Sequence, residues 1–241
     1  MHASPLDEKP VKTIIIDFDR TLIRENLLIQ WVLFLLSGDR LSMRRKLVFF
    51  TRSFYGGLES ILLSRSPSFA ERAVRVAYQT FMGIEAESIQ DLMTNKPIWK
   101  GGAYSINLNH ELLPVLSHIT EQTRRETLSE PKIAVSSQGS FKAAIEIFLK
   151  RQDVVEQMAR AGIRIDPGSI IANRLEVLEG KFTGKLRSPI ITKYNRLGSF
   201  SQNAVFIGDN EDEHAVKQLK NGKVRFVNYR KASRLQYEPR R

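Results

Sequence analysis

The feature that most constrains the fold is a short apolar run that stops at a cluster of carboxylates. Residues 11–16 read VKTIII and lead directly into Asp17, Phe18 and Asp19. An unbroken β-branched run is typical of a strand buried on both faces, as in parallel sheets. Two carboxylates spaced by two near a strand end can face one point, where they repel unless a cation or a proton intervenes. The run predicts a parallel strand whose end carries chemistry.

The same pattern of apolar strand followed by polar residues recurs along the chain. KIAV is followed by SSQG, and AVFI is followed by GDNEDE. Ligands of open α/β sheets bind beyond the carboxyl ends of the strands, so these polar segments are expected to converge. Strands alternating with helices predict an α/β fold, a Rossmann-like, doubly wound parallel sheet. Further strands are expected at 132–135, 204–207 and 224–227, a hairpin at 169–186, and helices at 110–120, about 141–161 and 211–219.

A long stretch between the first two strands differs from the rest. From residue 25 to 104 strand-like alternation is scarce and helical spacing dominates, which predicts an inserted α-helical cap domain. Gly56-Gly57, Pro67 and the segment 97–102 are its expected breaks. We therefore expect a catalytic core at 10–24 and 105–230, a helical cap at 25–104, and terminal segments at 1–9 and 231–241.

The most apolar segment, LLIQWVLFLL at 27–36, is only ten residues long. That is too short to span a bilayer, so a buried cap helix is expected, with an interfacial membrane contact as the alternative. The first twelve residues are polar and lack an apolar signal region, which predicts a cytoplasmic location.

The charge balance predicts a preference for anions. Lys plus Arg number 37 and Asp plus Glu 26, a formal net charge of +11. Basic residues cluster at 44–46 and 225–241 without the aromatic interleaving of a nucleic-acid stacking platform, so nucleic acid is not expected. The expected partner is a phosphorylated small-molecule substrate, and a peripheral contact with an anionic membrane stays open. The oligomeric state does not follow from the sequence.

Residue types narrow the chemistry further. The 241 residues contain no cysteine, which excludes disulfides, thiolate metal sites and thiol nucleophiles. Carboxylates at strand ends are hard oxygen ligands, and they suit Mg²⁺ better than Zn²⁺. Any catalysis must use oxygen or nitrogen groups.

Four segments in order resemble the motifs of the haloacid dehalogenase superfamily, and within it the phosphoserine phosphatase-like group. They are DFDRTL at 17–22, the strand followed by Ser136, Lys193, and GDNEDE at 208–213. The stretch IIANRLEVLEGKFTG at 170–184 is also similar to the segment which that group carries before its motif-three lysine. The resemblance covers residues 11 to 228 and places the helical insert where the family has its cap.

The resemblance implies a magnesium-dependent phosphomonoester hydrolase. Asp17 would form an aspartyl-phosphate intermediate, and Asp19 would act as general acid to the leaving group and then as base to water. Alternatives are a phosphotransferase of the same superfamily, which uses the same residues, and a basic binding protein on a catalytically silent core. A dehalogenase is disfavoured because that branch does without the second aspartate.

The resemblance also assigns the remaining site residues. Ser136, with Ser137 as fallback, would bind the phosphoryl oxygens together with backbone amides near Gly139, and Lys193 would neutralise charge. The family usually has a second Asp at position 213, where this chain has Glu, with Asp212 one residue earlier. The predicted metal ligands are Asp17, Asp19, Asp209 and either Asp212 or Glu213.

Substrate selectivity is expected to come from the cap. Between residues 27 and 54 it carries several aromatic side chains, beside the basic trio at 44–46. Either they fill the cap's own core or some face the site and favour a phosphate ester with an apolar, aromatic or additionally anionic group. The aromatic residues are Trp31, Phe34, Phe49, Phe50 and Phe54.

Overall fold

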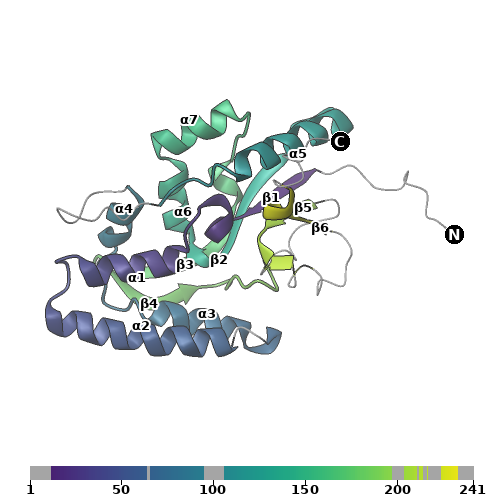
Figure 1. Ribbon diagram of the computed structural model, residues 1–241. Helices are drawn as coiled ribbons and strands as arrows, with labels where there is room; N and C mark the ends of the chain where they lie inside the picture. Colours follow the sequence, from purple (N-terminus) through teal and green to yellow (C-terminus); the bar gives the residue numbers. More distant parts are fainter. Residues whose placement is uncertain are drawn as a thin grey trace.

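The computed structural model describes residues 12–63, 66–94, 106–196, 204–210, 212–213, 216 and 224–232. Within these residues six strands form one sheet in the order β4-β3-β2-β1-β5-β6 (Figure 1). Neighbouring strands are parallel except for the β3-β4 hairpin. The predicted fold class, a Rossmann-like α/β sheet with helices, is therefore confirmed. The strands are β1 (Thr13–Asp17), β2 (Lys132–Phe141), β3 (Ile170–Leu178), β4 (Lys181–Arg187), β5 (Ala204–Gly208) and β6 (Val224–Asn228).

The strand β1 forms the centre of the sheet. Ile14, Ile15 and Ile16 are fully buried, as expected for an apolar strand covered on both faces. β1 pairs with β2 on one side and with β5 on the other, so that Asp17 lies in register with Ser136. The carboxyl ends of these three strands therefore share one edge of the sheet.

Helices cover the sheet in two groups. Figure 1 shows α1, α2 and α3 together on one side and α5, α6 and α7 on the other. None of the helices in the described parts of the chain has the length and low polarity needed to cross a membrane. The helices are α1 (Leu27–Ser37), α2 (Met43–Leu63), α3 (Ala70–Gln79), α4 (Glu87–Met93), α5 (Leu112–Thr127), α6 (Lys142–Leu149) and α7 (Gln152–Arg160), with short turns η2 (Phe18–Leu22), η3 (Pro67–Phe69) and η4 (Pro167–Ser169).

Aromatic side chains of the helical insertion between β1 and β2 belong to the main hydrophobic core, where the ring of Trp31 also lies 5.4 Å from that of Phe141 on β2. The ring of Trp31 stacks on Phe81 with 3.9 Å between ring centroids, and its Nε1 donates to the Oγ of Ser88 at 3.1 Å. Trp31, Phe34 and Phe49 are buried, so three of the five cap aromatics fill this core. The predicted boundaries of the cap and the core stay a prediction.

The expected helix break at Gly56-Gly57 is wrong, because α2 runs through both glycines. A Cβ at Gly56 would lie 2.7 Å from the Cγ2 of Thr80, whereas one at Gly57 would meet nothing within 4 Å. Gly56 therefore allows α2 to approach the end of α3 closely. The break at Pro67 is present as η3, and the segment 97–102 lies outside the described residues.

The single helix expected at 141–161 is also wrong, because two helices, α6 and α7, occupy this segment. Arg151 lies between them with extended backbone (φ −62°, ψ 133°). Its guanidinium donates to the carbonyl oxygens of Ile106 at 2.6 Å and Met93 at 3.3 Å, and to both carboxylate oxygens of Asp153. Hydrogen bonds to residues far away in the sequence thus stabilise a break between two helices at which the sequence has no Gly or Pro.

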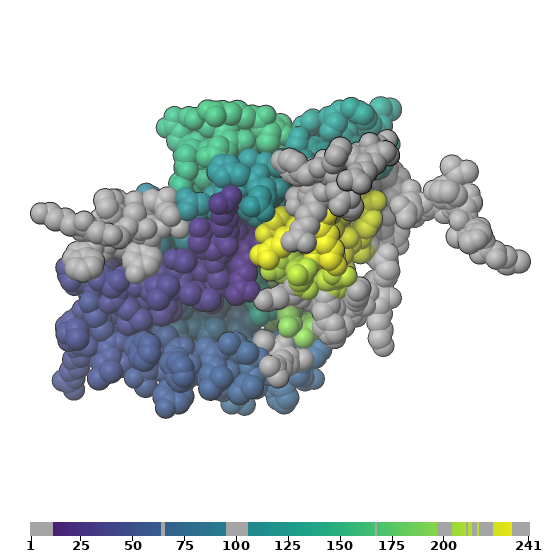
Figure 2. Space-filling view, viewed as in Figure 1, coloured from purple at the N-terminus to yellow at the C-terminus, as the bar shows by residue number. Residues whose placement is uncertain are grey.

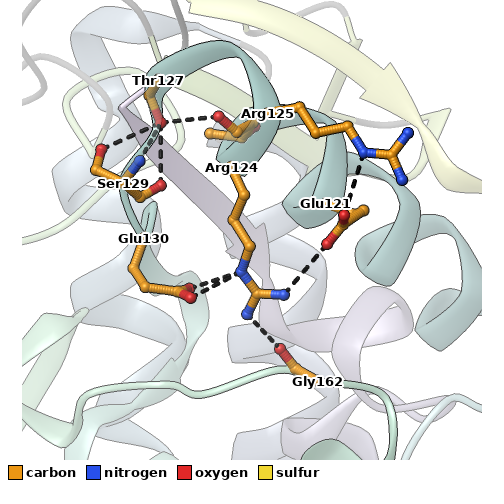
Figure 3. Close-up of polar contacts among 8 residues, drawn as sticks. Glu121, Arg124, Arg125, Thr127, Ser129, Glu130 and Gly162 are labelled. Carbon is orange, nitrogen blue, oxygen red and sulfur yellow. Dashed lines mark hydrogen bonds and ion pairs between the residues drawn. The ribbon is translucent and has the colours of Figure 1, made fainter.

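The helix α5 continues past its predicted end at Thr120 and ends at Thr127. Arg124 and Arg125, in its last turn, make polar contacts there (Figure 3). Arg124 donates from Nε to the carboxylate of Glu130 at 2.9 Å and from Nη2 to the carbonyl oxygen of Gly162 at 3.1 Å. These contacts join the end of α5 to the segment before β2 and to the turn after α7. The helix 211–219 lies mostly outside the described residues.

Candidate active site

A cavity of about 220 Å³ lies beyond the carboxyl end of β1. It brings together seven of the nine predicted site residues, and leaves out Ser136 and Glu213. Its described lining comprises Asp17, Asp19, Arg20, Asn26, Ser137, Gln138, Gly139, Lys193, Arg196, Asp209 and Asp212.

Asp17 ends the central strand and is only 6% exposed. Its Oδ1 accepts a hydrogen bond from Nη1 of Arg196 at 2.6 Å. Burial raises the pKa of Asp17 well above the usual value, repulsion from Asp212 raises it further, and Arg196 opposes the rise. A buried carboxylate of this kind needs positive charge beside it to stay ionised.

Asp19 is fixed by three donors from two parts of the chain. Its Oδ1 accepts from the backbone N–H of Leu27 at 2.8 Å, at the start of α1. Its Oδ2 accepts from the Oγ atoms of Ser137 and Ser140, both at 2.8 Å. Burial raises the pKa of Asp19, and these hydrogen bonds limit the rise. The turn thus presents a carboxyl group with both oxygens held.

The turn η2, which follows Asp17 and contains Asp19, is strained. Arg20 has a φ of 57°, in the left-handed region that non-glycine residues seldom adopt. The hydroxyl of Tyr229, after β6, donates to the carbonyl oxygen of Arg20 at 2.8 Å. Residues outside the turn therefore help to hold a conformation that aims the two carboxylates at one cavity.

The strand β2 presents Ser137 to the cavity. Ser136 is fully buried, and its Oγ has no hydrogen-bond partner among the described residues. β2 runs on to Phe141, past its predicted end at Val135, with an irregular register against β3. A Cβ at Gly139 would lie 3.2 Å from Oδ2 of Asp19, so the glycine leaves room for that carboxylate.

The helical insertion contacts this site directly. The hydroxyl of Tyr78, on α3, donates to the carbonyl oxygen of Gly139 at 2.7 Å. Asn26 caps α1 by accepting from the backbone N–H of Ile29 at 3.1 Å, and it also lines the cavity. Sequence analysis did not single out Tyr78, since nothing in the helical spacing marks a tyrosine as reaching another element.

Lys193 and Arg196 come from the segment after β4. The backbone N–H of Lys193 donates to Oε1 of Gln138 at 2.5 Å. Asn173, fully buried on β3, donates from Nδ2 to the carbonyl oxygens of Gln138 at 3.0 Å and Ile191 at 2.9 Å, and accepts from the N–H of Ile191 at 2.9 Å. Asn173 therefore positions the segment relative to β2.

Arg196 is the site residue that sequence analysis missed. It is 3% exposed and bridges the carboxylates of Asp17 and Asp212. Its guanidinium carbon also lies 4.9 Å from the ring centroid of Phe206. The sequence signal was a second basic residue three positions after Lys193, in the string KYNR. Only the folded segment shows that this residue contacts Asp17.

The segment after β5 supplies two more carboxylates. Asp209 directly follows the strand and is 8% exposed, and Asp212 is 9% exposed. Glu213 does not line the cavity, and its Oε2 lies 3.4 Å from Nζ of Lys231. Of the two alternatives for the last acidic position, Asp212 is the one placed at the cavity.

The donor set suits Mg²⁺ in its chemistry. Asp17, Asp209 and Asp212 offer hard carboxylate oxygens to one cavity. The repulsion that raises the pKa of Asp17 is of the kind that a bound cation relieves. In the structure Arg196 supplies the positive charge between two of these carboxylates. No group of three acidic or histidine side chains within the described ranges stands arranged to hold an ion.

None of the cap aromatics belongs to the described lining of the cavity. Phe50 and Phe54 are 52% and 59% exposed on the outer side of α2. The structure therefore supports the packing interpretation for Trp31, Phe34 and Phe49, and it assigns the other two to a different surface.

No family model and no curated protein sequence matches the chain. Solved structures do match. A phosphoserine phosphatase with an analogue of its phospho-aspartyl intermediate is 15% identical over 86% of this chain and 82% of that chain, with a TM-score of 0.51. A phosphoserine phosphohydrolase-like protein from Francisella tularensis is 15% identical over 89% and 86%, with a TM-score of 0.52. Cytosolic 5'-nucleotidase IIIB bound to cytidine is 10% identical over 93% and 76%, with a TM-score of 0.51. The chain thus shares the fold of these solved structures, in agreement with the fold that the sequence resemblance implied.

Proposed function

We propose that the chain is a phosphomonoester hydrolase in which Asp17 accepts the phosphoryl group. The observation that carries this proposal is that two carboxyl groups line the same cavity but are held by different hydrogen-bond partners. Asp17 is bound through one oxygen to Arg196, whereas Asp19 is held by α1 and by two serines. Two carboxyl groups in different environments suit the roles of nucleophile and general acid.

In the first step an oxygen of Asp17 bonds to phosphorus while the bond from phosphorus to the ester oxygen breaks. Arg196 binds Oδ1 of Asp17, which leaves Oδ2 for the attack. Asp19 donates its proton to the departing alkoxide, and a positioned acid of this kind adds about 10²- to 10⁴-fold to the rate. The step yields an alcohol and an aspartyl-phosphate.

In the second step Asp19, now ionised, takes a proton from water as the water oxygen attacks phosphorus. The bond to Asp17 breaks, inorganic phosphate leaves, and Asp19 is again protonated. Lys193, Ser137 and Gly139 also line the cavity, where the ammonium group of Lys193 and backbone amides near Gly139 can bind the phosphoryl oxygens while the hydroxyl of Ser137 donates to Asp19. These groups supply the charge stabilisation that dominates phosphoryl transfer.

We assign the Mg²⁺ ligands to Asp17, Asp209 and Asp212, which line one cavity, although their carboxylates do not stand in an ion-binding arrangement while Arg196 bridges Asp17 and Asp212. Both oxygens of the Asp19 carboxylate already accept hydrogen bonds, and Glu213 lies outside the cavity lining. Bound Mg²⁺ would polarise the phosphoryl oxygens as a Lewis acid.

The test is hydrolysis of an aryl phosphate by the whole chain, with quenched samples analysed by mass spectrometry for phosphate on Asp17. Asp17→Asn should abolish both turnover and the covalent adduct, a loss of roughly 10⁴-fold or more. Full activity of Asp17→Asn would exclude the mechanism.

A Mg²⁺ titration tests the metal assignment separately. Asp209→Ala should raise the Mg²⁺ concentration needed for half-maximal activity, because one direct ligand is lost. Glu213→Ala is the matched control, since Glu213 is absent from the cavity lining. Equal shifts for the two variants would contradict the ligand assignment and leave the role of Asp17 intact.

A further inference from the structure

The outer side of α2 carries a continuous stripe of large apolar side chains. They are spaced by four, three, four, four and three residues, so they share one face of the helix. Each is between 49% and 80% exposed. We call this face the α2 stripe; it consists of Met43, Leu47, Phe50, Phe54, Leu58 and Ile61.

The exposure of the α2 stripe is the opposite of the pattern found on most surface helices. A helix at the surface of a globular protein buries its apolar face and exposes its polar one. On α2 the single fully buried side chain among the described residues is Phe49, on the opposite side from the stripe. Figure 2 shows α2 along the lower edge of the molecule, open to the outside. An exposed apolar surface of this extent indicates an interaction site.

The charges beside the stripe are almost all basic. α2 carries Arg44, Arg45, Lys46 and Arg52, against Glu59 as its only acidic residue. Glu59 in turn accepts a hydrogen bond from Arg72 of α3 at 3.1 Å. At 100° per residue Arg44 and Lys46 border the stripe, one on each side, whereas Arg45 and Arg52 lie on the opposite face of the helix.

A cavity of about 460 Å³ opens on the side of α2 that carries Phe49, away from the stripe, and no residue of the stripe lines it. Arg44, Arg45 and Arg52 line it together with apolar side chains that include Val48 and Phe49. No carboxylate belongs to the lining that the structure describes.

We propose that α2 is a docking surface for a membrane that contains anionic lipid, with the stripe lying in the interface and the bordering residues Arg44 and Lys46 binding headgroups. Helices that lie in the membrane plane combine an apolar face with lysine and arginine, and each basic residue near an anionic surface favours binding. A second copy of this chain is the other candidate occupant. It would offer no acidic residue beside its own stripe to pair with Arg44 and Lys46, since Glu59 lies on the opposite face of α2, so charge complementarity favours the lipid.

The proposal is tested with lipid vesicles and the full chain. Co-sedimentation should be strong with vesicles of phosphatidylcholine plus phosphatidylglycerol, weak with phosphatidylcholine alone, and reduced by salt. Soluble glycerol phosphate should not displace the protein from the anionic vesicles, because it lacks the hydrocarbon that the stripe contacts. The assay uses no enzymatic substrate, so its result is independent of the proposed phosphatase activity.

Two sets of variants separate the contributions. Leu47→Gln, Phe54→Gln and Ile61→Gln together should lower the partition coefficient by about 100-fold or more, since three apolar side chains no longer enter the interface. Arg44→Gln with Lys46→Gln should lower binding to anionic vesicles by about fivefold per charge and leave the weak binding to neutral vesicles unchanged.

The matched control removes the same number of exposed apolar side chains elsewhere. Leu128, Val155 and Leu178 are 93%, 49% and 67% exposed and lie outside α2. The triple change to Gln at these positions should leave vesicle binding as in the unchanged chain, and circular dichroism should show all variants folded.

Three results would overturn the proposal. The first is equal binding of the stripe variant and the control variant to anionic vesicles. The second is binding that ignores lipid charge and salt. The third is a stable dimer by analytical ultracentrifugation that the stripe variant abolishes, together with no binding to vesicles, which would assign the stripe to a second copy of the chain.

Discussion

The candidate active-site cavity and the cavity beside α2 differ in how their charged side chains are paired. In the first, Asp17 and Asp212 are nearly buried, and Arg196 lies between them. In the second, three arginines line an open cavity with no described carboxylate. Buried charges are costly without partners, so the first cavity is built from groups that already stabilise one another. Exposed charges need no partner within the fold, and those of α2 are therefore available to a surface outside it.

The largest expected effect concerns Asp19 in the first cavity. Asp19→Asn keeps the shape of the side chain but removes the proton donor, so kcat for an alkyl phosphate should fall by about 10²- to 10⁴-fold. The loss should be smaller for a nitrophenyl phosphate, whose leaving group needs little protonation. Glu213→Gln, outside the cavity, is the control. A loss below about tenfold with the alkyl substrate would place the acid elsewhere.

Arg196 and Arg52 test whether buried and exposed guanidinium groups differ in their contribution to folding. Arg196→Met leaves two buried carboxylates without their shared partner and should lower the free energy of unfolding by about 3 kcal/mol, measured by urea denaturation in EDTA. Arg52→Met, on the exposed side of α2, should change it by less than about 0.5 kcal/mol. Similar changes in the free energy of unfolding for the two variants would show that the buried and the exposed guanidinium groups contribute equally to folding.

The two glycines of α2 give the smallest effect and the closest matched pair. Gly56→Ala places a Cβ against Thr80 and should lower the free energy of unfolding by about 1 kcal/mol or more. Gly57→Ala meets nothing within 4 Å and should raise it by about 0.5–1 kcal/mol, because alanine favours the helix. Thermal denaturation compares both. Destabilisation by Gly57→Ala would mean that α2 packs differently from the structure.

The strand ends were predictable because their signal is local. An apolar run followed by Asp17 and Asp19, or by Gly208 and Asp209, indicates both the strand and the edge where its polar residues gather. The sequence could not decide whether Ser136 or Ser137 is the phosphate-binding serine. That choice depends on how far β2 continues and on its irregular pairing with β3.

The sequence did not predict the features that depend on contacts between residues far apart in the chain. Arg196 contacts Asp17 from 179 positions away, and Arg151 breaks a helix by bonding to carbonyl groups of the insertion. The periodicity of α2 predicts which side chains share a face, but not whether that face points inward. Phe49 and Phe50 are neighbours in the chain, yet one is buried and the other exposed.

The hydrogen bonds of Asn173 make the site sensitive to a change that alters no volume. Asn173→Asp would replace one NH₂ by an oxygen in a side chain of nearly the same shape. The carbonyl oxygens of Gln138 and Ile191, which now accept from that NH₂, would then face an acceptor. The segment that carries Lys193 and Arg196 would be pushed from β2 without any residue of the cavity being altered. Chemical deamidation of Asn173 as the protein ages would therefore disturb the site from a distance. It would do so without removing any contact to the substrate.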